Sequence, residues 1–395
     1  MRILASLLLL FVFSTIAKAQ TIQGKVVDIN TLEPIPFVSL GIIGTNTATV
    51  TNESGEFVIR IENFPAKLRF SHVSYLLKET FVMDAQSILT IRLNPAAINL
   101  KEVEIRPDEG KNILKSALLN ALSYQNTPFY GNAFYRQLTS TNNKATEIHE
   151  LFYDINWNIK YVQGWAVKQS RFAEINDPTK FTLSNQSFLT FAYAGYLLPN
   201  KRNRYVSIKY LDDYTIKVDR YIQHEDQDIA VVTCKLNKAR KNLFYANSTY
   251  YIGTKDLKIY RLENKIYNMP CEFSPGLSLK FPSFLETIAT FNGTDQPIPV
   301  LESVATKVYL NLTDGRRDLN SVISSLLTVF KIDDQLKNQR FEGLNSDIKD
   351  KKVIQSVKYD PKFWKNNPIV KQTTLEDTFI KMMESKQAFG TMTNP

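Results

Sequence analysis

The sequence predicts a mainly β protein in which a small N-terminal β-sandwich is followed by a large antiparallel sheet or half-barrel with a few helices. Short segments with the residue alternation of half-buried strands begin at residue 21. From residue 129 a long series of strand-like segments follows without helices between them, which favours an antiparallel sheet. The chain has 395 residues, of which 44% are hydrophobic and 22% charged, as in folded globular proteins.

Residues 1–19 are expected to be a signal peptide. Arg2 precedes an apolar run, Ile3–Phe13, and Ala17-Lys-Ala19 supplies the small residues that signal peptidase accepts before Gln20. The apolar run is shorter than the ~20 residues of a membrane-spanning helix. No Cys stands at the cleavage site to carry a lipid anchor. We therefore expect an exported protein, periplasmic or outer-membrane-associated, with no transmembrane segment after signal cleavage.

The charge balance is basic, with a formal net charge of +9. In an exported protein such an excess favours attraction to anionic lipids or acidic glycans, so no nucleic-acid partner is expected. Most basic residues are scattered. Two clusters, which we interpret as solvated surface, are Lys201, Arg202 and Arg204, then Lys235, Lys238, Arg240 and Lys241.

The strands of the predicted sandwich lie within residues 20–106. Alternation over Ile22–Val27 predicts the first strand, and Phe37–Leu40 the next. The turn Asn52-Glu-Ser-Gly55 then joins Thr49–Thr51 to Phe57–Ile61. Because Gly takes positive φ at little cost, this segment predicts a hairpin with Phe57 pointing inward.

Five segments of this region, in order, carry a family resemblance: Thr21–Asp28, Glu33–Val38, Thr51–Phe57, Leu89–Leu93 and Leu100–Ile105. Together they resemble the carboxypeptidase-regulatory-like domain, a transthyretin-type β-sandwich found at the N-termini of cell-envelope proteins of Bacteroidota-type bacteria. Leu68–Tyr75 resembles a further strand of that family, although Ser74 stands where the family often has Gly. The resemblance implies an accessory sandwich that serves as a scaffold or docking module.

The family name does not extend to peptidase activity. A zinc carboxypeptidase holds its metal with a His-x-x-Glu pair and a distant His. The residues three positions after His72, His149 and His224 are Tyr75, Phe152 and Gln227. We therefore expect no catalytic residues, no metal site and no cofactor.

A helical linker is predicted over residues 107–128. Apolar residues recur at helical spacing within Glu109–Ser123, and Pro128 ends the pattern. The carboxylate of Asp108 or Glu109 near the start suits the helix dipole.

Residues 129–332 predict a β-rich domain. Its expected strands are Tyr130–Leu138, Thr146–Ile155, Asn158–Lys168, Tyr205–Lys209, Tyr214–Gln223, Ile229–Leu236, Leu243–Ile252, Leu257–Tyr267, Phe284–Phe291 and Val300–Leu312. The insertion Ser170–Asn203 is long enough for a functional loop or flap. Pro128–Arg136, Glu147–Tyr153 and Tyr250–Tyr260 are similar to segments of envelope proteins that join the same sandwich to a β-rich domain of unknown function. Tyr250–Tyr260 also resembles a hairpin of lipoprotein-carrier-like sheets, which implies one wall of a hydrophobic pocket.

The C-terminal part predicts helices. Leu319, Val322, Ile323, Leu326, Leu327 and Phe330 have helical spacing, with Asp318 as N-cap, so this segment is expected to form a lid or to pack in the core. Residues 333–395 are expected to form a charged loop, an anchor at Tyr359–Trp364, a closing helix over Leu375–Lys386 and a frayed end.

A few residues are candidates for a site. His149 shares a strand face with Glu147 while Glu150 points away, so one carboxylate at most could join it on a metal. His224–Asp228 predicts an acidic turn and lacks the spacing of a calcium loop. Aromatic clusters at Phe129–Tyr135, Phe188–Tyr196 and Tyr245–Tyr251 suit a glycan platform, a pocket or simply the core. Cys234 and Cys271 are either a disulfide or two separate thiols.

The functional prediction is a non-catalytic exported envelope protein that acts as a scaffold or docking module and binds an envelope or outer-membrane protein partner. Three alternatives stay open. A carrier of a lipid or other apolar ligand predicts an apolar pocket lined from the strands between residues 205 and 312. An envelope hydrolase predicts carboxylates that converge in a polar cleft. A glycan-uptake accessory predicts an exposed row of aromatic residues.

Overall fold

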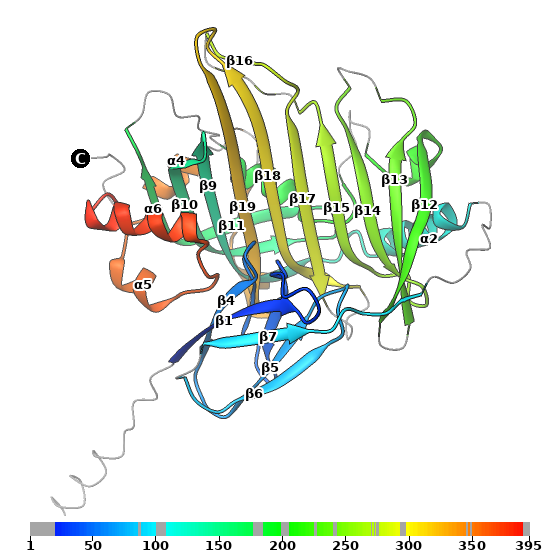
Figure 1. Ribbon diagram of the computed structural model, residues 1–395, viewed down its shortest axis with the longest axis horizontal. Coiled ribbons are helices and arrows are strands. Elements are labelled where there is room, and N and C mark those ends of the chain that lie inside the picture. Colours follow the sequence, from blue (N-terminus) through cyan, green and yellow to red (C-terminus); the bar gives the residue numbers. More distant parts are fainter. Residues whose placement is uncertain are drawn as a thin grey trace, which may run out of the picture.

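The computed structural model describes residues 20–85, 88–99, 108–176, 185–198, 205–224, 227–239, 243–269, 271, 273, 276–292, 298–344, 347 and 350–389. The predicted signal peptide, the basic cluster at 201–204 and residues 240–241 of the second cluster lie outside these residues. Within them the protein is mainly β, with a small two-sheet unit in front of a large open sheet (Figure 1). The predicted fold class is confirmed.

The small unit is a sandwich of two sheets. One sheet has the order β4 (Glu56–Ile61), β1 (Gln20–Asp28), β7 (Leu89–Leu93), and the other has the order β3 (Ala48–Val50), β2 (Ser39–Ile42), β5 (Ala66–Ser71), β6 (Lys78–Val82). The alternation predicted for the first strand is observed: Ile22 and Val26 are buried in the core between the sheets, together with Leu40, Phe57 and Phe70.

The predicted hairpin of this unit is wrong, because its two strands belong to different sheets. β3 pairs with β2, whereas β4 pairs with β1. The turn between them crosses from sheet to sheet. Gly55 there has φ +69°, and a Cβ on it would lie 2.6 Å from the Val26 carbonyl oxygen. Phe57 points inward as expected, with no exposed surface.

The large sheet has 13 strands, and all its pairings are antiparallel. Its order is β20-β11-β10-β9-β19-β18-β17-β15-β14-β13-β12-β8, and β16 pairs with β18. The strands are β8 (Ile98–Asn99), β9 (Phe129–Thr141), β10 (Lys144–Trp157), β11 (Val162–Glu174), β12 (Tyr214–His224), β13 (Gln227–Leu236), β14 (Tyr245–Gly253), β15 (Ile259–Tyr267), β16 (Ser278–Leu279), β17 (Phe284–Asn292), β18 (Val300–Thr313), β19 (Asp318–Ile332) and β20 (Glu342–Gly343). Its two end strands do not pair with each other, so it stays open.

The helix predicted at residues 319–330 is wrong, because this segment is the central strand β19. It pairs with β9 on one side and β18 on the other. Leu319, Ile323 and Leu327 point to one face with Ser321 and Ser325, which are buried and hydrogen-bonded. Leu326 and Phe330 pack on the other face. Apolar residues on both faces therefore produced an apparent helical spacing, and Asp318 pairs with Lys280 instead of capping a helix.

Helices cover one face of the large sheet, here called the inner face. The predicted helix α2 (Glu109–Ser123) is confirmed and packs on β12, β13 and β14. α3 (Gln186–Ala192) packs on β18 and β19, so the described part of the Ser170–Asn203 insertion contributes to the core. The short strand predicted at 205–209 is wrong: the segment enters the 3₁₀ helix η1 (Ile208–Asp213), with Tyr205 and Leu211 buried against the inner core.

The sandwich and the C-terminal tail cover the opposite, outer face (Figure 1). The tail contains α5 (Pro361–Asn366) and α6 (Thr374–Ser385), the latter being the predicted closing helix. Residues 333–352, expected to be loop, include η2 (Asp334–Asn338), β20 and the start of α4 (Asp350–Gln355). The sheet is therefore buried on both faces around β9–β11 and β19.

Most aromatic residues of the three predicted clusters belong to the core. Tyr135, Phe191, Tyr193, Tyr196 and Tyr250 are all buried in the inner core. No glycan platform is formed by these five side chains. Cys234 is buried and Cys271 is half-buried, and both are free thiols in the structure.

Candidate functional site

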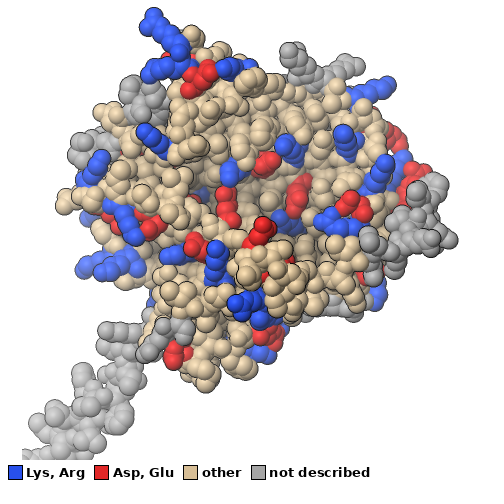
Figure 2. Space-filling view, in the orientation of Figure 1, with Lys and Arg blue, Asp and Glu red and all other residues tan. Residues whose placement is uncertain are grey.

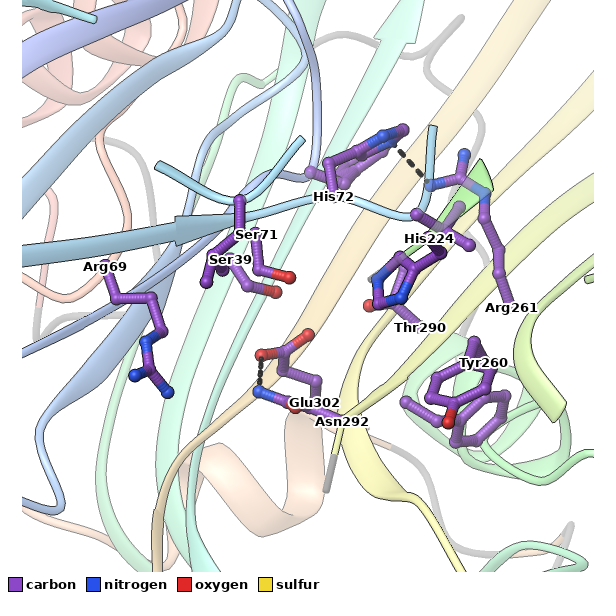
Figure 3. A pocket seen from close by; sticks show the side chains of 14 residues that line it. Ser39, Arg69, Ser71, His72, His224, Tyr260, Arg261, Thr290, Asn292 and Glu302 are labelled. Atoms are coloured by element: carbon purple, nitrogen blue, oxygen red, sulfur yellow. Dashed lines mark hydrogen bonds between the residues drawn. The ribbon is translucent and has the colours of Figure 1, made fainter. Parts of the chain in front are cut away.

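A polar pocket of about 110 Å³ lies between the sandwich and the outer face of the large sheet (Figure 3). From the sandwich come Ser39 of β2, Arg69 and Ser71 of β5, and His72 directly after it. From the sheet come His224, Tyr260, Arg261, Thr290, Asn292 and Glu302. The pocket exists because the two units are packed together, since neither contributes a complete wall.

Glu302, near the start of β18, is the single acidic residue that lines this pocket. Its carboxylate accepts a hydrogen bond of 3.1 Å from Asn292 Nδ2 and another from the Ser39 hydroxyl. Burial raises the pKa of Glu302, which these two hydrogen bonds lower only in part. Among the residues that the structure describes, no Lys or Arg forms an ion pair with it.

The two arginines of the pocket contact carboxylates other than Glu302. Arg69 donates to Glu79 from Nε at 3.0 Å and from Nη2 at 2.9 Å, and it shares this carboxylate with Lys67, whose Nζ lies 2.5 Å from the other oxygen. Arg261 donates from Nε to Glu263 at 2.7 Å.

His72 joins the sandwich to the sheet. Its Nε2 lies 3.2 Å from Arg261 Nη1, and the backbone N–H of Ser74 approaches Nδ1 at 3.2 Å. Two donors that face the ring nitrogens disfavour an imidazolium, in which both nitrogens would also be donors. Burial and the Arg261 charge lower the pKa of His72 to about 3, so the ring is neutral at physiological pH.

His224 and Tyr260 form the opposite wall of the pocket. Their rings stack, with centroids 6.1 Å apart and an angle of 29° between the planes. The Tyr260 hydroxyl donates to Asp256 at 2.6 Å, which fixes the ring. His224 ends β12 and Gln227 begins β13, and residues 225–226 of the acidic turn predicted there lie outside the described part of the chain.

The predicted geometry around His149 is observed, on the inner face of β10. Its Nε2 lies 2.8 Å from Glu147 Oε1, and neither residue has exposed surface. Asp350 lies nearby, bonded to the backbone N–H and the hydroxyl of Ser187. Burial raises the pKa of Asp350, and its interactions with His149 and Ser187 offset this rise only in part.

These acidic residues converge in the protein interior. Lys351 Nζ lies 2.8 Å from Glu174 and 3.6 Å from Glu147. Glu147, His149 and Asp350 line neither the pocket of Figure 3 nor three further cavities on the described residues. Within the same residues, no group of three or more His, Cys, Asp or Glu side chains is arranged to hold a metal ion.

Glu150 points to the outer face, as expected, and lies between two arginines. Its carboxylate accepts hydrogen bonds from Arg136 of β9 and Arg171 of β11, which are its direct neighbours across the sheet. The C-terminal tail closes over this triad: Glu376 lies 3.5 Å from Arg136, and Glu384 lies 3.4 Å from Arg171. The Arg171 guanidinium also stacks over Trp364 and Phe389.

Sequence reasoning did not find the polar pocket. Its residues run from Phe37 to Glu302 and come from strands that are far apart in the chain. The sequences of these strands do not indicate which strand ends lie next to one another in the fold. The packing of the sandwich on the sheet, which brings them together, could not be predicted from strand alternation.

Comparison with known proteins identifies the sandwich. Residues 22–105 match the family model of the CarboxypepD_reg-like domain, so the resemblance seen in the sequence is confirmed for this part of the chain. The match ends at residue 105 and therefore defines the class of this domain, not of the whole chain. No curated protein matches the chain.

Among solved structures, a LolA superfamily protein from Nitrosomonas europaea shares 12% identity with this chain at a TM-score of 0.24, over 56% of this chain and 96% of its own. MucB in complex with periplasmic MucA shares 9% identity at a TM-score of 0.17, over 56% of this chain and 94% of its own. The Pseudomonas aeruginosa MucA/MucB complex shares 8% identity at a TM-score of 0.17, over 59% and 99%. These scores are too low to define a common fold.

Two further features concern the helices and the surface charge. No helix among the described residues is long and apolar enough to cross a membrane. Basic and acidic side chains are interspersed over the face seen in Figure 2, so the net positive charge does not form a single basic patch there.

Proposed function

We propose that this chain is a non-catalytic cell-envelope protein, exported by the signal peptide predicted at residues 1–19, that acts as a docking scaffold. The observation that carries the proposal is the position of the sandwich. One side of it is fixed on the large sheet, while its opposite edge strand, β6, is free and bears exposed apolar side chains. This arrangement presents a recognition edge on a rigid base.

Contacts of three kinds hold the sandwich on the large sheet and the C-terminal tail. Glu53 forms an ion pair of 3.1 Å with Lys307 of β18. Asn52 Nδ2 donates to the Lys371 carbonyl oxygen at 3.1 Å, and Lys371 Nζ donates to Gln23 at 2.9 Å. Val50 is fully buried in an apolar cluster with residues of β9, β10 and the tail. The apolar cluster, together with a tail that contacts both units, favours a fixed orientation of the sandwich over independent motion.

The free edge has the features of a strand-addition site. Within the described residues β6 pairs with β5 and with no second strand. Phe81 of β6 is 64% exposed, and Met83, directly after the strand, is 69% exposed. An unpaired strand edge offers backbone hydrogen bonds, and alternate apolar side chains add specificity. We infer that the occupant is an extended segment of an envelope or outer-membrane protein partner.

The absence of catalysis is part of the proposal. The carboxylates that converge at Glu147, Glu174 and Asp350 lie in or at the edge of the inner core, away from the described cavities. In the polar pocket both arginines have partners, and His72 is held neutral by two donors. Neither group supplies an accessible nucleophile with an adjacent base.

A carrier function has less support. It needs an apolar cavity on the strands between residues 205 and 312. The inner face of these strands is covered by α2 and by aromatic side chains, which are those of Phe191, Tyr193, Tyr196 and Tyr205. The pocket on the outer face of the same strands is polar and small.

Site-specific photo-crosslinking in the native envelope tests this proposal. A photoreactive phenylalanine analogue at Phe81 should form a discrete adduct with one envelope protein. The same analogue at Leu119, an exposed residue of α2, is the control and should not form that adduct. A lipid adduct at Phe81, or the same adduct from both positions, would contradict docking through β6.

A further inference from the structure

We propose that the polar pocket between the sandwich and the sheet binds an alkylammonium group, with the Glu302 carboxylate as its counter-ion. This inference concerns a different surface from the β6 edge and does not depend on docking there. It rests on the ion pairs of the pocket, the free acceptor positions on Glu302 and the apolar residues around it.

Glu302 is the charged group of the pocket that has no ion-pair partner among the described residues. Arg69 shares the Glu79 carboxylate with Lys67, and Arg261 is paired with Glu263. His72 is neutral. A half-buried carboxylate of this kind is stabilised by an incoming cation and disfavours an anion.

The hydrogen-bonding capacity of the Glu302 carboxylate also favours a cationic ligand. An ionised carboxylate has about four acceptor positions, and Glu302 uses two of them, for Asn292 and Ser39. Figure 3 shows the carboxylate directed into the pocket, with the Ser39 and Ser71 hydroxyls on the side of the sandwich. An ammonium group is a donor of three hydrogen bonds and can use Glu302 together with these hydroxyl oxygens.

Apolar side chains provide room for an alkyl chain. Phe37, Val73, Leu77 and Phe291 contribute to the lining, and Leu77 is 43% exposed. A lysine-type ligand buries its methylene groups along such a surface while its charged end reaches a carboxylate. The volume of about 110 Å³ suits one such group rather than an oligosaccharide or a lipid chain.

Two sources supply this chemistry in an envelope: a lysine side chain of a protein and the ethanolamine headgroup of a phospholipid. Calorimetric titration of the mature protein with Nα-acetyl-lysine amide and with glycerophosphoethanolamine distinguishes them. At least one should bind with a Kd on the order of millimolar, as is usual for a single charged contact. Tighter binding of the lysine amide assigns a polypeptide, and tighter binding of the phosphate ester assigns a headgroup.

Variants test the role of Glu302. Glu302→Gln should weaken binding at least about tenfold. Glu286→Gln is the matched control, because Glu286 lies on neighbouring β17 and already pairs with Lys265 at 3.4 Å, so its loss should leave binding unchanged. Ser71→Lys, which tethers an ammonium at the pocket wall, should abolish binding in a folded protein and keeps the proposal testable if Glu302→Gln does not fold.

Three results would overturn the inference. One is the absence of heat from both amines up to tens of millimolar. Another is equal affinity in wild type and folded Glu302→Gln. The third is saturable binding of inorganic phosphate in place of the amines, which would show that the arginines and not Glu302 determine the ligand.

Discussion

Arg136 and Glu150 face each other across β9 and β10, with the arginine Nε 2.7 Å from the carboxylate oxygen, and both are almost completely buried. Arg171 approaches the same carboxylate from β11. Burial alone would raise the pKa of Glu150, but the two guanidinium groups hold it below its ordinary value. The C-terminal tail packs on this triad, so the triad should keep the tail and the sandwich in place on the sheet.

Glu150→Gln should strongly destabilise the protein. The substitution removes the carboxylate that two buried guanidinium groups share and leaves them only the longer contacts with Glu376 and Glu384, and breaking a buried ion pair on one side costs about 3–5 kcal/mol. Urea unfolding followed by tryptophan fluorescence measures the change. Asp377→Asn, which removes a carboxylate from the exposed pair with Lys381, is the control and should cost less than about 1 kcal/mol. Similar losses in both variants would contradict a central role for Glu150.

Thr373→Ala should loosen the tail without unfolding the sheet. Thr373 caps α6: its hydroxyl accepts a hydrogen bond from the Glu376 N–H, and its own N–H donates to the Glu376 carboxylate. Loss of such a cap costs about 1 kcal/mol. Hydrogen exchange should become faster at residues 374–385 and remain unchanged in β18. Equal acceleration in both segments would show that the tail is not a separate strap.

His72 should make the protein less stable in acid. The pKa of His72 is about 3 in the folded protein, against 6.5 for the unfolded side chain. Between these values the unfolded state binds more protons, so the free energy of unfolding falls as the pH decreases, by at most about 1.4 kcal/mol per pH unit. Solvent near the half-buried ring reduces this slope.

The measurement compares wild type with His72→Gln by urea unfolding at about pH 7 and about pH 4.5. The variant lacks this titration, so its stability should fall less over the same interval. A fall equal to that of wild type would show that His72 is not held neutral at the interface between sandwich and sheet.

The cysteines should behave as two free thiols, of which Cys234 is buried and Cys271 is half-buried. Burial raises the pKa of Cys234 strongly and that of Cys271 to a smaller extent, so both react slowly while the protein is folded. Alkylation followed by mass spectrometry should label Cys271 first and Cys234 only after unfolding. Protein that is unfolded without reductant and takes up no label would demonstrate a disulfide instead.

The elements with a single apolar face were predictable from the sequence. The helix Glu109–Ser123 has its apolar side chains on one stripe, and it is observed with these bounds. In β10, which is covered on both faces, the alternation of a strand still placed Glu147 and Glu150 on opposite faces, as found, although it did not predict that both are buried.

The sequence failed where an element is covered on both sides. β19 has buried serines on its inner face and half-buried Leu326 and Phe330 on its outer face, so neither face shows a continuous apolar pattern. The pocket was missed for a related reason. Glu302 acquires its surroundings from Ser39, more than 260 positions earlier, through the packing of two units that no local pattern specifies.

Native mass spectrometry of the mature protein, purified from its own envelope, tests the central claim most directly. A docking scaffold should be recovered with a defined envelope protein and should release no lipid or fatty acid on extraction. Phe81→Ser combined with Met83→Ser should remove the partner while the protein stays folded. A co-purifying lipid that persists in this double variant, with no protein partner, would contradict the account and support an apolar carrier.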